Sequence, residues 1–164
     1  MRTVTPARQA PNPAGDFNHA LNCANERDAF DSLMRAAESG CVRAQFLVGL
    51  AYHVGRGAPV DYGLARTWYR RAAGSGDGYA IANLGVMSLL GQGEPSGELE
   101  AYTWVRSAVG LGHVWLRPAL DWLENWITGA VGTESCLVDG LLPEIPVLRT
   151  CTAAQCDPSC CNAV

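Results

Sequence analysis

The sequence predicts an all-α fold, an α-solenoid of about three antiparallel helix hairpins, on two observations. First, the stretch at residues 65–76 recurs 36 residues upstream at 29–40 and 36 residues downstream at 101–112. Second, three glycines recur at the same spacing, since Gly49, Gly55 and Gly57 return as Gly85, Gly91 and Gly93. A fixed period of this size is typical of stacked repeats, in which each unit buries its apolar face against its neighbours.

Length and composition agree with one globular domain. The chain has 164 residues, of which 48% are hydrophobic, and its formal net charge is −4. The basic residues are spread along the repeats, so no nucleic-acid partner is expected. The absence of a run of 18 apolar residues predicts no transmembrane segment. The first 20 residues carry no apolar block of signal-peptide length, so we expect a cytoplasmic protein or one exported by a specialised secretion system.

Three segments are predicted along the chain. Residues 1–25 contain Pro6, Pro11 and Pro13, which disfavour a helix, and are interpreted as a mobile N-terminal arm. Residues 26–129 are predicted to form the solenoid. Residues 130–164 are predicted to be an extended, cysteine-rich tail, because helical periodicity ends there.

The first hairpin is predicted from an N-cap at Asn25 and an apolar stripe at helical spacing that ends at Gly40. A second helix is expected over about 42–54, where Gly55 and Gly57 end it. The stripe of the first helix consists of Ala29, Phe30, Leu33, Ala36 and Ala37.

The second hairpin repeats this plan, with helices over about 65–74 and 79–90. Trp68 is expected to fill the gap between units, whereas Arg66, Arg70 and Arg71 are expected on the opposite, exposed side. The buried stripe is expected to be Ala65, Trp68, Tyr69, Ala72 and Ala73.

The third unit departs from the plan. Pro118 occupies the first turn of a predicted last helix, where proline is tolerated. Polar residues face away from its apolar stripe, as a capping repeat requires. The stripe is Ala119, Trp122, Leu123, Trp126 and Ile127.

The pattern Ala-x-x-Trp-Tyr-x-x-Ala-Ala-x-x-Gly over 65–76, followed by Ala80, Leu84, Gly85 and the Gly91-x-Gly93 turn, resembles the Sel1-like repeat family, relatives of the tetratricopeptide repeats. The resemblance covers about residues 27–129. It implies a right-handed α-solenoid that acts as an adaptor for other proteins. Trp115 and Leu116 depart from the family pattern, and the paired cysteines of its cysteine-rich branch are missing, so penicillin binding is not carried over.

The predicted function is therefore a non-enzymatic adaptor that binds a protein or peptide on its concave face, with no cofactor. In tetratricopeptide-like stacks the first helix of each hairpin lines the inner surface. The candidate partner-binding residues are accordingly Arg66, Arg70 and Arg106, of which Arg70 and Arg106 stand one period apart and suit an acidic partner. The three histidines, His19, His53 and His113, show no metal-pair or nucleophile–base spacing, so no catalytic site is predicted.

The alternative function places the active part in the tail, where four cysteines crowd into the last 14 residues: Cys151, Cys156, Cys160 and Cys161. Disulfides or another redox role, a zinc site, lipidation at the end, and modification by an enzyme that treats the tail as a peptide-precursor core all remain open. The apolar run at 137–148 either packs against the last helices or binds a partner.

Overall fold

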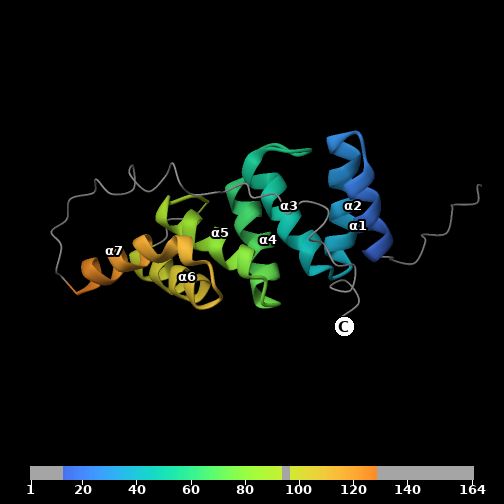
Figure 1. Cartoon of the computed structure of the whole chain (residues 1–164). Helices are drawn as coiled ribbons and strands as arrows, with labels where there is room; N and C mark the ends of the chain where they lie inside the picture. Colours follow the sequence, from blue (N-terminus) through green and yellow to red (C-terminus); the bar gives the residue numbers. More distant parts are fainter. Residues whose placement is uncertain (1–12, 94–96, 129–164) are drawn as a thin grey trace, which may run out of the picture.

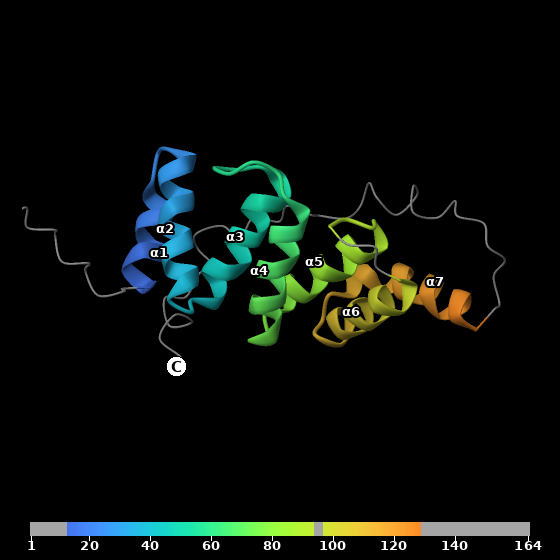
Figure 2. The same cartoon turned by 180° about the vertical axis from the view of Figure 1, so that it is seen from behind.

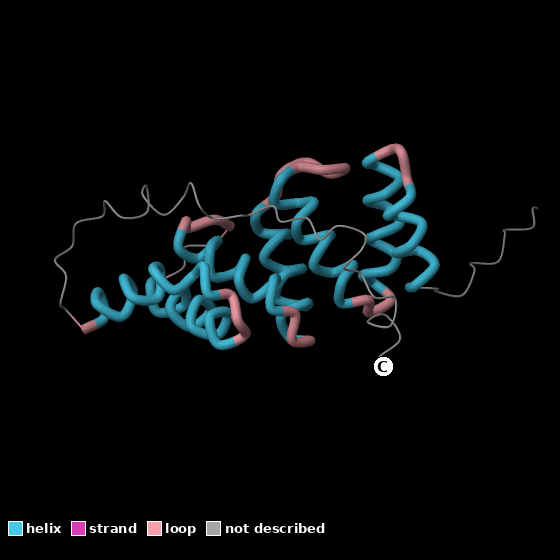
Figure 3. The backbone as a smooth tube through the Cα atoms, viewed as in Figure 1, coloured by secondary structure: helices cyan, strands magenta, loops and turns pink. Residues whose placement is uncertain are grey.

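The computed structural model describes residues 13–93 and 97–128. Every regular element in these ranges is helical, so the predicted all-α solenoid is confirmed (Figure 3). None of these helices is long and apolar enough to cross a bilayer. The elements are α1 (Pro13–Asn22), α2 (Glu26–Glu38), α3 (Val42–Val54), α4 (Tyr62–Gly74), α5 (Gly78–Leu89), α6 (Glu98–Gly110), the 3-10 turn η1 (Val114–Leu116) and α7 (Arg117–Ile127).

The helices follow one another in chain order along an elongated stack, as both faces of the molecule show (Figures 1 and 2). The most extensive packing is within the pairs α1/α2, α3/α4 and α5/α6. The packing between pairs, of α2 on α3 and of α4 on α5, is less extensive. The hairpins therefore begin one helix away from where the sequence reading began them. A repeating array has the same periodicity whichever helix is counted first, so periodicity alone does not set this phase.

Glycines explain the tight pairing within α3/α4 and α5/α6. A Cβ atom on Gly49 would lie 2.7 Å from the Tyr69 ring, and one on Gly85 would lie 3.0 Å from a Val105 methyl. These two contacts are 36 residues apart on both sides. Glycine recurs at this position because the two helices of each pair approach so closely there that only a hydrogen atom fits as the side chain.

The N-terminal arm is the main correction to the predicted domains. Residues 13–22 form α1, with Pro13 as the first helical residue, where its missing N–H needs no partner. Phe17 is 2% exposed and packs with Ala36 and Ala37. The prediction of a mobile arm through residue 25 is therefore wrong for this helix, because the apolar face of α2 needs a cover.

Trp68 occupies the junction between the first two helix pairs, as predicted. Its side chain is 6% exposed and packs in one cluster with residues from α1, α2 and α3. The cation of Arg71 lies 4.5 Å above the indole ring. The other members of this buried cluster are Phe17, Ala36, Ala37, Cys41, Ala44 and Val48.

The C-terminal unit caps the stack through η1 and α7. Pro118 lies in the first turn of α7, as expected. The predicted stripe is buried at Ala119 and Leu123, but Ile127 is 45% exposed. Leu116, which departs from the repeat pattern, is buried beneath this unit.

Candidate partner-binding groove

A groove of about 400 Å³ opens between the first helix pair and α3. It receives side chains from the C-terminal end of α1, from one face of α2 and from one face of α3. Its lining residues are Ala20, Leu21, Cys23, Ala24, Glu26, Ala29, Phe30, Leu33, Arg43, Leu47, Leu50, Ala51, Val54 and Arg56.

The walls of the groove are apolar and its rim is charged. Phe30 is held edge-on against Tyr52, with ring centroids 5.3 Å apart. At the rim Glu26 pairs with Arg56 across 3.2 Å, and both side chains are well exposed. A second guanidinium, that of Arg43, lies 3.9 Å from the carboxylate of Asp77. An apolar trough with fixed charges at its edges is suited to hold and orient a peptide segment.

The free thiol of Cys23 lines this groove, 3.4 Å from Nδ1 of His19. The same ring nitrogen lies 2.9 Å from the Ser32 hydroxyl. A relay of nucleophile, base and orienting group needs both ring nitrogens, so we interpret this contact as a tie between α1 and α2. The four-residue spacing of His19 and Cys23 indicates a side-chain contact only where the segment is helical. Residues 1–25 were expected to be a mobile arm, so this contact was not predicted.

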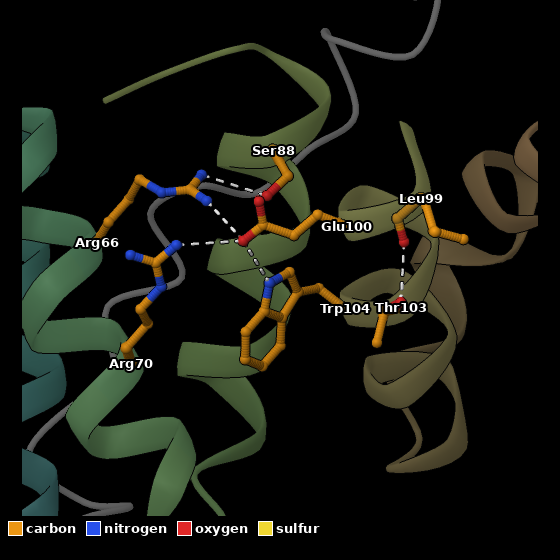
Figure 4. Close-up of polar contacts among 7 residues, drawn as sticks. All are labelled: Arg66, Arg70, Ser88, Leu99, Glu100, Thr103 and Trp104. Atoms are coloured by element: carbon orange, nitrogen blue, oxygen red, sulfur yellow. Dashed lines mark hydrogen bonds and ion pairs between the residues drawn. The ribbon is translucent and has the colours of Figure 1, made fainter. Parts of the chain in front are cut away.

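Arg66, a predicted partner-binding residue, is instead fully buried. Its guanidinium donates to the Ser88 hydroxyl at 3.2 Å and to Oε1 of Glu100 at 2.9 Å, as Figure 4 shows. Oε1 of Glu100 also accepts hydrogen bonds from Arg70 and from the Trp104 indole, each at 3.2 Å. The prediction that Arg66 faces solvent is wrong, because its charge joins α4, α5 and α6 around one carboxylate.

The other predicted site residues have different positions. The Arg70 side chain is 39% exposed beside Glu100, and Arg106 is exposed on α6 with its cation 5.9 Å from the Tyr102 ring. These arginines lie on α4 and α6, and neither lines the groove. Their binding role stays a prediction. The tail cysteines Cys151, Cys156, Cys160 and Cys161 lie outside the described residues, and so does the run at 137–148.

The carboxylate at the centre of this cluster is held in its ionised form. Partial burial acts to raise the pKa of Glu100, but the hydrogen bond from Trp104 and the charges of Arg66 and Arg70 outweigh it, so that its pKa lies below the ordinary 4.5. Because the folded protein binds the proton less tightly than the unfolded chain, the cluster contributes its stability above pH 4.5 and loses it as the pH falls further.

Replacing Glu100 by glutamine should therefore lower the free energy of unfolding at pH 7 by roughly 1 to 2 kcal/mol, since hydrogen bonds to a charged acceptor are stronger than those to an amide and this site is partly solvated. The difference from the parent should shrink as the pH falls below 4.5. Urea unfolding at several pH values measures it. A difference that stays constant down to pH 3 would contradict the proposed charge cluster.

Comparisons with known proteins agree with this geometry. The Sel1 repeat model matches residues 42–77 and 78–113, which coincide with the pairs α3/α4 and α5/α6. A Sel1 repeat protein from Oxalobacter formigenes superposes with a TM-score of 0.66 at 28% identity, covering 77% of this chain and 53% of that one. A protective antigen of uropathogenic Escherichia coli strains that displays an SLR fold gives 0.63 at 25% identity, covering 69% of this chain and 25% of that one.

One curated relative also matches. The chain is 40% identical over 60 residues to the chitin synthase regulator SKT5 of Saccharomyces cerevisiae, which covers 37% of this chain but 9% of the yeast protein. The chain thus spans about half or less of the length of the relatives it matches.

The fold and the groove define a class of protein, the helical-repeat scaffold built from stacked hairpins. Within that class, the two matched Sel1 repeats and the solved structures with this fold support a place in the Sel1-like repeat family. Proteins with these repeats generally act as scaffolds for protein interactions.

Proposed function

We propose that this chain is a non-enzymatic scaffold that binds an apolar segment of a partner protein in the groove between α1, α2 and α3. The observation that carries the proposal is the groove itself, whose apolar walls include Phe30, Leu33 and Leu47. Its lining also contains two guanidinium groups, of Arg43 and Arg56, and a single carboxylate, that of Glu26. Each of these guanidiniums faces a carboxylate, Arg56 that of Glu26 and Arg43 that of Asp77, so the apolar walls and not a surplus of charge provide the binding surface.

The phase of the repeat supports the same surface. The matched repeats begin with α3 and α5, so the rule that the first helix of each repeat lines the inner surface applies to these two helices. Leu47 and Leu50 of α3 lie on the groove side. A partner segment that enters the groove would therefore lie along the same face of the stack that tetratricopeptide-like proteins use.

Site-specific photo-crosslinking tests this proposal. A photo-reactive amino acid is placed at Leu47, which lines the groove, or at Thr67, which is exposed on α4 and serves as the matched control. Each variant is irradiated in the cells from which the protein comes, and adducts are identified by mass spectrometry. We expect one partner protein at position 47 and none at position 67. Adducts of the same partner at both positions, or at position 67 alone, would rule out the groove.

A further inference from the structure

Side chains that occupy the same position in successive repeats form a second surface along the stack. Arg43, Tyr79 and Trp115 are spaced 36 residues apart and lie in the first turns of α3, α5 and η1. The Arg43 cation is 5.5 Å from the Tyr79 ring, the Tyr79 and His113 rings are 5.0 Å apart, and the His113 and Trp115 rings are 6.4 Å apart. These four side chains form a continuous line, here called the aromatic row.

One side of the aromatic row is uncovered by the described residues. Tyr79 is 43% exposed and Trp115 is 36% exposed. Beside them Leu111 and Val114 are exposed by 57% and 71%. Burial lowers the pKa of His113 below 6.5, with Asp77 offsetting part of the effect, so its ring is neutral at pH 7 and stacks as an apolar surface. A contiguous patch of this kind is typical of a surface that another segment covers.

The spacing of the row suits a proline-containing strand. The four groups extend over at most about 17 Å. A polyproline II helix rises about 3.1 Å per residue, so about five or six residues would follow the row. Proline rings pack well on aromatic faces, and this conformation is already formed in prolyl segments, so binding costs little ordering entropy.

The chain itself carries such a segment at residues 141–148, Leu-Leu-Pro-Glu-Ile-Pro-Val-Leu. Pro143 and Pro146 are three residues apart, which is one turn of a polyproline II helix, so both rings would lie on the same side. The remaining residues of the segment are apolar except Glu144.

The segment is tethered within reach of the row. Helix α7 begins directly after η1 and its 11 residues extend about 16 Å. Residues 129–140 can extend by up to about 40 Å, which is more than the return distance requires. A short tether of this kind gives an effective concentration on the order of millimolar, so even a weak intrinsic affinity would fill the site.

We propose that residues 141–148 of this chain dock as an extended prolyl segment on its own aromatic row, with Pro143 and Pro146 against the rings of Tyr79, His113 and Trp115. The row would then be occupied from within the molecule, and the groove between α1 and α3 would remain open to a partner. The proposal is independent of the identity of that partner.

Nuclear magnetic resonance of the full, isotope-labelled chain tests it. We expect Overhauser contacts between the Trp115 indole and the ring protons of Pro143 and Pro146, with the indole resonance assigned by a Trp115→Phe variant. In a variant with Pro143→Ser and Pro146→Ser these contacts should be lost and the Trp115 resonance should move toward that of an exposed indole. Adding a synthetic peptide of residues 139–150 to this variant should restore it. The Trp126 resonance on α7 is the internal control and should not move.

Two results would overturn the proposal. One is a parent chain without these Overhauser contacts, whose Trp115 resonance is unchanged by the two serine substitutions. The other is a Trp115 resonance in the parent that moves on dilution, which would show that a second copy of the chain is the occupant.

Discussion

Replacing Trp68 by alanine is expected to lower the free energy of unfolding by about 3 to 5 kcal/mol. The indole is 6% exposed and belongs to one buried cluster with side chains of α1, α2 and α3. The same cluster contains Ala36, Ala37 and Ala44, whose methyl side chains are too short to fill the space that the indole leaves. The cavity would therefore stay open within this buried cluster.

Urea unfolding followed by circular dichroism measures this loss. The control is Leu99→Ala, because Leu99 is 69% exposed on α6 and its truncation should cost less than about 1 kcal/mol. Equal losses in the two variants would contradict the assignment of Trp68 to the junction between the helix pairs.

Replacing Gly57 by alanine is expected to lower the free energy of unfolding by roughly 2 to 5 kcal/mol. Gly57 has φ +73°, a conformation that costs other residues about 1 to 2 kcal/mol. The added Cβ would also overlap the carbonyl oxygen of Glu26 and lie 2.7 Å from Cβ of Phe30, and overpacking of this kind costs about 1 to 3 kcal/mol. Gly93 makes the same approach to Tyr62 one period later.

Gly40 provides the control for this variant. It has φ +94°, but a Cβ at this position would meet nothing within 4 Å. Gly40→Ala should therefore lower the free energy of unfolding only by the cost of the positive φ angle, about 1 to 2 kcal/mol. Both variants are compared by urea unfolding, and similar losses would mean that the close approach to α2 contributes nothing. Since Glu26 and Phe30 line the groove, Gly57→Ala should also weaken partner binding.

The helices and their periodicity could be predicted from the sequence because α2 to α6 are each followed by a glycine, and the apolar residues of several helices recur at helical spacing. The pairing of the helices could not, since the repeat looks the same from either starting helix. It depends on contacts such as Gly49 with Tyr69, which are distant in sequence. Helix α1 is not predicted by the rule that proline breaks a helix, because Pro13 begins this helix.

The candidate site was less predictable than the fold. Arg66 lies at a position where helical spacing alone indicates an exposed residue, but it is buried beside Ser88 and Glu100, which lie 22 and 34 residues away in the sequence. The groove combines residues from α1, α2 and α3, so it could not be seen within a single repeat. The sequence contains the 36-residue spacing of Arg43, Tyr79 and Trp115, but it does not indicate that these side chains form one surface. The contacts of the Tyr79 and His113 rings show this.

We propose that the groove between α1, α2 and α3 holds the partner. Titration calorimetry with the partner recovered by crosslinking tests it most directly, comparing the parent chain with Leu47→Asp in the groove and Thr67→Asp on α4. If the groove binds the partner, Leu47→Asp should weaken binding at least about tenfold, equivalent to about 1.4 kcal/mol, whereas Thr67→Asp should bind as the parent does. Equal affinity of all three chains would contradict it.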